Sequence, residues 1–244
     1  MKPAAFACAL AAAASPAAAQ DAGWSFAASA YLWLPALSTS IDTDEGTIDT
    51  DLSASDAIAD LEFAFMGAFE ARNGRWGLIG DLIYSDIQLS SPSRRGQLFD
   101  KTTLETELGV FSGYVMYRVR ETTDVAFDIG GGFRGYSADV ELRLKGNLAE
   151  DRDFGGGETW VDPLVAARVI VPFSDKWFGT AFADFGGTGS DEMTYQALAS
   201  VGYRFNARWS AQAAYRYLSI EKSFGGSDTT MELYGPVLGA TYRF

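Results

Sequence analysis

The chain has 244 residues, no histidine and one cysteine, and its formal net charge is −13. Nucleic acid is held mainly by Lys and Arg, so a chain this acidic is not expected to bind it. The single cysteine, Cys8, lies in an N-terminal segment that we expect to be removed. Disulfides, thiol catalysis and cysteine-ligated metals are therefore excluded from the mature protein.

Residues 1–19 have the pattern of a secretory signal peptide. Lys2 gives a basic start, residues 6–14 form a short apolar run, and Ala17 to Ala19 are the small residues of a cleavage site. The alternative is a transmembrane helix, but crossing the bilayer takes ~20 strongly apolar residues, and this run is shorter and rich in alanine. We expect an exported mature chain, residues 20–244, that starts at Gln20, forms one domain and has a charge of 18 − 32 = −14.

Apolar and polar residues alternate with a period of two along the mature chain, which predicts β-strands. One apolar face and one face of small, polar and charged residues suit a barrel with lipid outside and a packed lumen inside. The pattern predicts ten strands, at residues 24–34, 61–72, 75–90, 102–119, 123–144, 157–172, 176–186, 193–206, 208–222 and 230–244. An eight-stranded barrel is the alternative if two weaker segments are loops.

The connections between these segments alternate between short and long. Four short turns lie at residues 72–75, 120–123, 173–176 and 205–208, and longer connections lie at 35–60, 91–101, 146–156, 187–192 and 223–229. Short periplasmic turns and longer extracellular loops are typical of outer-membrane barrels, and an even strand number places both termini in the periplasm. The sequence therefore predicts an all-β fold, a closed antiparallel transmembrane β-barrel.

Aromatic residues gather near the short turns, where a barrel would meet the membrane interface. They are Trp76, Tyr117, Phe173, Trp177, Tyr203, Phe205, Trp209, Tyr242 and Phe244. A soluble β-sandwich also uses alternating strands. It does not account together for the export signal, the two kinds of connection and the aromatic residues at the end of the chain.

The last predicted strand presents Leu238, Ala240, Tyr242 and Phe244 on one face. This face is similar to the C-terminal signature that the outer-membrane assembly machinery recognises in barrel proteins. Such a strand has an apolar face and an unsatisfied edge until it pairs with the first strand. The resemblance implies that the barrel assembly machinery binds the chain during biogenesis, and that the folded protein contacts outer-membrane lipid and lipopolysaccharide.

Further stretches resemble a widespread family of small proteobacterial outer-membrane barrels with OmpA-like or OmpW-like architecture. They include Tyr-Leu-Trp-Leu-Pro at residues 31–35 and Val-Gly-Tyr-Arg-Phe at 201–205. The other stretches are residues 75–84, 160–164, 215–218, 235–239 and 242–244. The resemblance implies a barrel in the outer membrane and brings no known substrate or cofactor.

The strand parities direct many charged side chains into the lumen. They are Glu70, Arg72, Asp81, Arg118, Asp128, Arg134, Asp162, Arg168, Asp184, Arg204, Arg216 and Arg243. Charges inside a narrow barrel must be paired or hydrated. We therefore expect a salt-bridge network that fills the lumen of a protein with a structural or surface-interaction role. The alternative is a narrow porin-like channel for small solutes or ions, because rings of fixed charge set selectivity.

The absence of histidine bears on catalysis, because the known proteases, lipid A acyl-chain enzymes and phospholipase of this membrane rely on it. Without histidine the chain has no ready general base near neutral pH. We expect no catalytic residue, no cofactor and no enzymatic activity, and a site built only from carboxylates is the alternative.

Two local features complete the sequence predictions. The first long connection carries Asp42, Asp44, Glu45, Asp49, Asp51, Asp56 and Asp60, whose oxygens could bind Ca²⁺ or Mg²⁺. A twelve-residue calcium-loop pattern is missing, so we expect a solvated acidic loop with no metal, and a short helix over residues 53–61 that Ser53 or Ser55 caps. Residues 130–132 are three glycines inside a strand, where they allow close packing of strands or bending.

Overall fold

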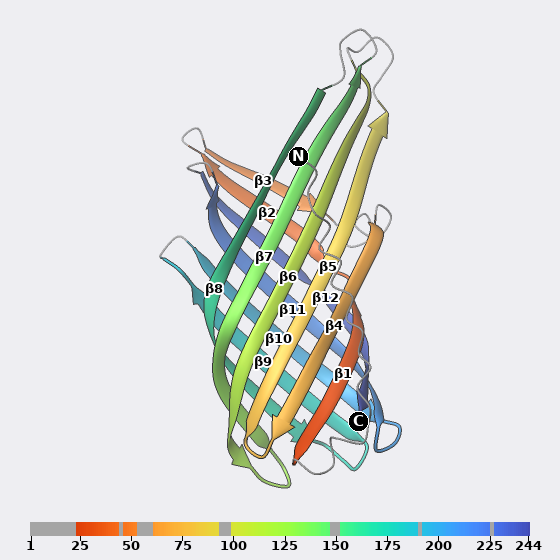
Figure 1. The fold of residues 1–244 in the computed structure, drawn as a ribbon, viewed down its shortest axis with the longest axis vertical. Coiled ribbons are helices and arrows are strands. Elements are labelled where there is room, and N and C mark those ends of the chain that lie inside the picture. Colours follow the sequence, from red (N-terminus) through yellow and green to blue (C-terminus); the bar gives the residue numbers. More distant parts are fainter. Residues whose placement is uncertain are drawn as a thin grey trace.

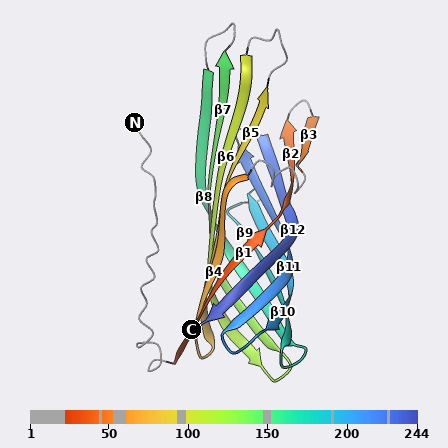
Figure 2. The same ribbon diagram turned by 90° about the vertical axis from the view of Figure 1, so that its right-hand side faces the viewer.

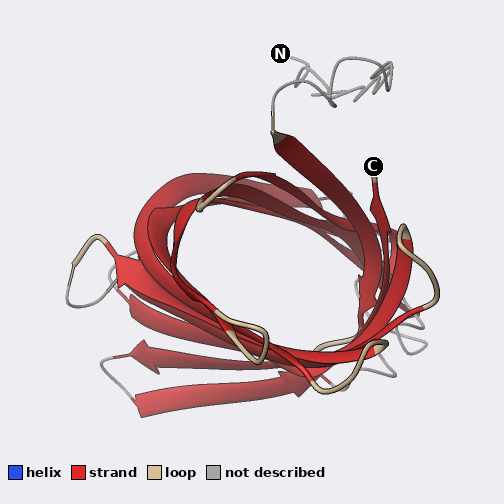
Figure 3. Cartoon of the chain, turned by 90° about the horizontal axis from the view of Figure 1, so that it is seen from below, coloured by secondary structure: helices blue, strands red, loops and turns tan. Residues whose placement is uncertain are grey.

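In the computed structural model the chain forms β-strands that close into a barrel, and Figure 3 shows the ring along its axis. The structure describes residues 23–43, 46–52, 61–92, 99–146, 152–189, 192–224 and 227–244. The wall consists of β1 (Trp24–Trp33), β4 (Leu61–Asn73), β5 (Trp76–Pro92), β6 (Phe99–Glu121), β7 (Ala126–Gly146), β8 (Arg152–Pro172), β9 (Trp177–Gly187), β10 (Met193–Arg204), β11 (Trp209–Phe224) and β12 (Ser227–Arg243).

Each wall strand pairs antiparallel with the next, and the pairing of β1 with β12 closes the ring. The predicted all-β, closed antiparallel barrel of ten strands is therefore confirmed, and the eight-stranded alternative is wrong. Within the described ranges no helix is long and apolar enough to cross a membrane.

The short turns lie together at one end of the barrel, which we call the turn end; the opposite end is the loop end (Figure 1). Gly74, with φ of +55°, joins β4 to β5. It is the first central residue of a two-residue hairpin turn, a position that favours glycine. The Asn206 side chain accepts hydrogen bonds from the Arg208 and Trp209 amides at 2.9 Å each and so forms the turn before β11. At the same end the Phe244 amide donates to the Phe26 carbonyl at 3.0 Å.

The prediction of a loop over residues 35–60 is wrong for part of that range. It contains β2 (Ala36–Thr43) and β3 (Gly46–Leu52), a hairpin outside the closed ring. The reason is that β12 extends beyond the end of β1, and β2 pairs with this free edge from Asp42↔Asp228 to Ala36↔Tyr234. The chain leaves β1 at Leu34, whose carbonyl oxygen would lie 2.2 Å from a Cβ at Gly235, so the crossing requires glycine there. The expected helix at 53–61 lies almost wholly outside the described residues.

Four strands rise well above the rest of the wall at the loop end. The β5–β6 ladder reaches Pro92↔Lys101, and the β7–β8 ladder reaches Leu144↔Arg152. By contrast, β8 pairs with β9 only over Leu164–Pro172. Figures 1 and 2 show β5–β8 as a sheet that projects past the rim, away from the β2–β3 hairpin. Three of these strands, β5, β6 and β8, are longer than predicted, and β6 has 23 residues.

The outer surface of the barrel is apolar. Val165, Leu238 and Phe244 are 65%, 60% and 67% exposed, and many further large apolar side chains also point outward. Aromatic pairs surround the turn end, with ring centroids 5.0 Å apart for Trp76–Tyr117, 4.9 Å for Trp177–Tyr203 and 4.9 Å for Trp209–Tyr242. A surface this apolar is suited to lipid, and the rings match the aromatic girdle of a membrane interface.

Two glycines of β7 let β6 and β7 come close together, as predicted for this stretch. A Cβ at Gly132 would lie 1.9 Å from the Gly113 carbonyl oxygen, and one at Gly130 would lie 2.1 Å from that of Val115. Any side chain at these positions would displace the neighbouring backbone. The space beside Gly130 is filled by Met116, which is completely buried in the lumen.

Candidate functional site in the lumen

The candidate site is the interior of the barrel, where most of the charged residues predicted to face the lumen meet in two groups. The turn-end cluster comprises Glu70, Arg72, Arg118, Asp128 and Arg168, which lie on β4, β6, β7 and β8. The central cluster comprises Asp81, Arg134, Asp184 and Arg216, with the polar side chains of Tyr31, Tyr114 and Gln196.

Asp128 is the centre of the turn-end cluster and is fully buried. Its Oδ1 accepts from Arg118 Nε at 2.7 Å, and its Oδ2 accepts from Arg72 Nη2 at 3.0 Å and from Arg168 Nη2 at 2.7 Å. One carboxylate therefore receives hydrogen bonds from three guanidinium groups that come from three strands. Hydrogen bonds between ions are stronger than neutral ones, so Asp128 fixes the spacing of these strands.

Glu70 supplies the second carboxylate of the turn-end cluster. It forms a two-point contact with Arg168, with Nη1–Oε2 and Nη2–Oε1 distances of 2.8 Å each, and its Oε1 also accepts from Arg72 Nη2 at 3.1 Å. Arg118 reaches outward to Glu121 at 2.7 Å. With Glu121 included, three arginines face three carboxylates, so the cluster is electrically balanced.

The central cluster contains two ion pairs joined by an amide. Arg134 Nη2 lies 2.6 Å from Asp184 Oδ2, and Arg216 Nη2 lies 3.0 Å from Asp81 Oδ1. Gln196 connects the pairs, because its Nε2 donates to Asp184 Oδ2 at 3.1 Å and its Oε1 accepts from Arg216 Nε at 2.7 Å.

Two tyrosines add hydrogen bonds to the central cluster, although Asp184 Oδ1 is buried without a hydrogen-bond partner among the described residues. Tyr31 donates to Asp81 Oδ2 and Tyr114 donates to Asp184 Oδ2, both at 2.8 Å. The Arg134 guanidinium also donates to Ser112 at 2.9 Å and Thr194 at 3.1 Å. Polar groups in this low-dielectric interior are thus held by several partners, which is the condition for their stability.

An apolar layer lies on the loop-end side of both clusters, and we call it the apolar seal. It consists of Trp33, Met66, Ile83, Val110, Tyr136, Leu218, Ile220, Leu233 and Val237. On strands that carry both kinds of residue, the seal residue is farther from the turn end than the charged one, as with Met66 and Glu70 on β4. Leu218 and Ile220 are 1% and 2% exposed, so this level of the lumen is tightly filled.

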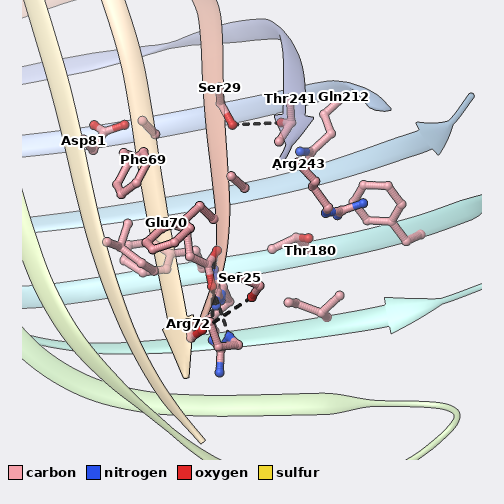
Figure 4. Close-up of a pocket in the computed structure, with 18 of the residues that line it drawn as sticks. Ser25, Ser29, Phe69, Glu70, Arg72, Asp81, Thr180, Gln212, Thr241 and Arg243 are labelled. Carbon is pink, nitrogen blue, oxygen red and sulfur yellow. Dashed lines mark hydrogen bonds and ion pairs between the residues drawn. The ribbon is translucent and has the colours of Figure 1, made fainter. Parts of the chain in front are cut away.

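A cavity of about 600 Å³ lies beside both clusters, which supply part of its lining, and extends to the turn end. Figure 4 shows Arg243, Glu70 and Arg72 around it, together with small polar side chains of β1 and β12. Arg204 also lines it, with its guanidinium 4.6 Å above the Phe178 ring. Within the described residues, neither Arg204 nor Arg243 forms an ion pair. Asp162 is buried and lies opposite Arg134 in the β7–β8 ladder.

The loop-end rim carries a separate ion pair. Glu192, in the connection before β10, accepts from Lys222 Nζ at 2.6 Å and from the Thr188 hydroxyl at 2.5 Å. These hydrogen bonds hold the pKa of the Glu192 carboxyl below its ordinary value. The Lys222 ammonium also lies 5.7 Å from the centroid of the Trp160 ring.

Sequence reasoning missed several participants in the lumen. Tyr31, Tyr114 and Gln196 have the inward parity of their strands, but only charged residues were considered. The apolar seal had a similar signal, because Ile83 and Leu218 are bulky apolar residues two positions beyond the inward Asp81 and Arg216.

In the part of the chain that the structure describes, no group of three or more His, Cys, Asp or Glu could hold a metal ion. The acidic side chains of residues 42–60 lie outside that part.

A closed antiparallel barrel with an apolar belt outside and a polar, charged interior is an integral outer-membrane β-barrel of the Gram-negative type. The protein is located in that membrane, with the turn end in the periplasm and the loop end outside the cell, and its belt contacts lipid. This agrees with the location and the barrel that the family resemblance implied. Leu238, Ala240, Tyr242 and Phe244 face outward, and their recognition by the assembly machinery stays a prediction.

Among solved structures the fold is similar to the outer membrane protease OmpT from Escherichia coli. The two share 10% sequence identity with a TM-score of 0.60, over 92% of this chain and 98% of that chain. The toluene transporter TodX from P. putida (9% identity, TM-score 0.37, 91% and 89% covered) and the translocator domain of the autotransporter NalP from Neisseria meningitidis (13%, 0.36, 91% and 89%) also match. No protein-family model and no curated protein sequence matches the chain.

Proposed function

We propose that the protein is a sealed, non-catalytic outer-membrane barrel with a structural or surface-interaction role, and that its lumen does not conduct. The observation that carries this proposal is the apolar seal above two paired charge clusters. A hydrated ion would have to lose its water to cross a dry apolar layer, at a cost of several kcal/mol. Opening a path would also require separating side chains of which none is more than 9% exposed.

The pairing of the lumen charges supports the same proposal. Selectivity rings present fixed charge to a passing solute. In both clusters the arginines are already bound to carboxylates at 2.6–3.1 Å, as in Arg134–Asp184 and Arg216–Asp81. A buried ion pair satisfied in this way fixes the relative positions of strands. The clusters thus act as internal cross-links of a rigid support.

The β5–β8 extension supports a surface-interaction role. From Arg152 to Thr159, β8 pairs with β7 and has no second strand partner among the described residues. A free strand edge can accept an extended segment of another chain as an additional strand. The extension lies outside the membrane, where an external partner or lipopolysaccharide would meet it first.

The alternative function is a narrow channel, which the cavity at the turn end favours, because it already hollows out part of the lumen. Single-protein recordings in planar bilayers separate the two functions. We expect the refolded wild type to give no reproducible conductance steps, and the double variant Trp33→Ala/Leu218→Ala to give them. Leu238→Ala, on the lipid-facing side of β12, is the matched control and should stay silent. Regular steps from the wild type would overturn the sealed barrel in favour of the channel.

A further inference from the structure

We propose that the cavity at the turn end is a binding site for a small organic anion, with a phosphate-type head bound by Arg204 and Arg243 and a compact apolar group in the remaining space. This site goes beyond the sealed-barrel function and does not depend on it, because a conducting barrel would contain the same pocket. The cavity is reached from the periplasm, since Ser25 and Ala207 line it at the turn end.

The lining of the cavity carries positive charge that no carboxylate in its ion pairs neutralises. Six arginines line the cavity: Arg72, Arg118, Arg168, Arg204, Arg216 and Arg243. The first three and Arg216 are bound by Glu70, Asp128, Glu121 and Asp81 at 2.7–3.1 Å. Four positive and four negative charges cancel, which leaves the two charges of Arg204 and Arg243. A phosphate monoester carries nearly two negative charges at neutral pH.

The guanidinium groups of Arg204 and Arg243 make few hydrogen bonds to the described residues. Arg204 is held against the Phe178 ring and makes one long contact, 3.4 Å from Nη1 to the Asp175 carbonyl oxygen. Most of its donors therefore have no protein partner in the described part of the chain. Arg243 has a carbonyl partner for its backbone amide, but none of the side-chain hydrogen bonds within the described ranges involves it. A planar guanidinium with free donors is matched to the oxygens of phosphate or carboxylate.

Arg72 contributes a third free donor that an anion in the cavity could bind. Arg72 also lines the cavity, and its Nη1 is buried without a hydrogen-bond partner among the described residues, although Nη2 is bound to Glu70 and Asp128. Buried donors of a charged group are normally satisfied, and an unsatisfied one calls for a ligand or an ion. An anion between β4 and β12 would give this nitrogen an acceptor.

The rest of the lining determines the class of anion. Phe178, Phe182, Leu198 and Ile170 contribute apolar surface from β8, β9 and β10. The volume of about 600 Å³ exceeds what a bare phosphate ion fills and is within the range of small-molecule sites. The pocket therefore fits an amphiphilic anion better than an inorganic one, with the head at the arginines and the apolar group against the aromatic rings.

The test uses the full chain refolded in an uncharged detergent, with folding verified by the gel shift on boiling. Phenyl phosphate, inorganic phosphate and phenol are titrated separately by isothermal calorimetry. We expect saturable binding of one phenyl phosphate per chain, at least tenfold tighter than binding of either of its parts. Sulfate in excess should displace it, and an equally concentrated neutral sugar should not.

Variants then locate the binding site. Arg204→Gln and Arg243→Gln should each weaken phenyl phosphate binding at least tenfold. Arg75→Gln removes an exposed arginine of the first turn, outside the cavity lining, and should bind like the wild type. No saturable binding to the wild type, or unchanged binding to the Arg204→Gln/Arg243→Gln double variant, would overturn the proposal. If a variant does not fold, the titration of the wild type alone tests the proposal. Binding or its absence leaves the conductance experiment on the sealed barrel unaffected.

Discussion

The most direct test of the turn-end cluster is the substitution Asp128→Asn. Asp128 is fully buried and accepts hydrogen bonds from Arg72, Arg118 and Arg168, whose side chains are only 10–14% exposed. Asparagine keeps the shape of the residue but has no negative charge, and its amide nitrogen is a donor that would face guanidinium donors. Three arginines would then share Glu70 and the exposed Glu121.

The size of the effect follows from the contacts that are lost. Hydrogen bonds to a charged group contribute about 1.5–3 kcal/mol each, and asparagine retains one acceptor oxygen for the three arginines. One positive charge is also left without a counter-charge in a poorly hydrated interior. Removing one partner of a buried ion pair typically costs about 3–5 kcal/mol. We expect the free energy of unfolding to fall by that amount, because the contacts of Asp128 are short and their arginines cannot turn to solvent.

Equilibrium unfolding in urea, in micelles or vesicles and followed by tryptophan fluorescence, measures this difference. Asp124→Asn is the matched control, because Asp124 is exposed in the β6–β7 turn and should change stability by less than about 0.5 kcal/mol. In the double variant Asp128→Asn/Arg118→Gln the loss should be less than the sum of the single losses. A change below about 1 kcal/mol for Asp128→Asn would falsify the view that this cluster holds the barrel together.

Three further predictions concern other parts of the barrel. Leu218→Ala opens a void in the apolar seal and should lower the free energy of unfolding by about 2–5 kcal/mol in the same urea experiment; a neutral result would mean that the seal is loosely packed. Gly132→Ala places a Cβ 1.9 Å from a backbone oxygen and should prevent or greatly slow folding in the gel-shift assay, whereas Gly156→Ala meets nothing within 4 Å and should fold normally. Because the pKa of Glu192 is lowered, its contact with Lys222 stabilises the rim above the ordinary carboxyl pKa and is lost as pH falls through the lowered value. Lys222→Met should flatten the dependence of the unfolding midpoint on pH between about 5 and 3, and an unchanged slope would contradict that coupling.

The sequence was sufficient to predict the barrel because each wall strand carries its own signal. Alternation in stretches such as residues 194–205 marks the two faces, and turns such as Asn73-Gly74 mark the strand ends. The β2–β3 hairpin was missed because its acidic residues hid the alternating β-branched Thr39, Ile41 and Thr43. The heights of β6 and β8 were underestimated because the polar residues that continue a strand above the membrane are also typical of loops.

The sequence predicts which side chains point into the lumen, but not which of them contact one another. The alternation along β7 and β8 places Asp128 and Arg168 on the inner face of the wall. They are neighbours only because the register of β7 and β8 pairs Asp128 with Arg168. Register depends on turn geometry and on tilt around the whole ring, which a single sequence does not contain. For the same reason, nothing in the sequence distinguished Arg204 and Arg243, which have no carboxylate partner in the described chain, from the arginines that do.

The way β12 divides its edge between two partners has a consequence for how the protein is made. Its turn-end half pairs with β1, from Ala27↔Arg243 to Trp33↔Val237, and its loop-end half pairs with β2. The closing contacts join residues as distant as Ser29 and Thr241, 212 positions apart, so this step bears the largest loss of chain entropy and comes late. For β12 to pair along its full length, β1 and β2 must already lie end to end, so that together they form one continuous strand edge. A nascent barrel whose β2–β3 hairpin is displaced is therefore expected to pair only the turn-end half of the β12 edge.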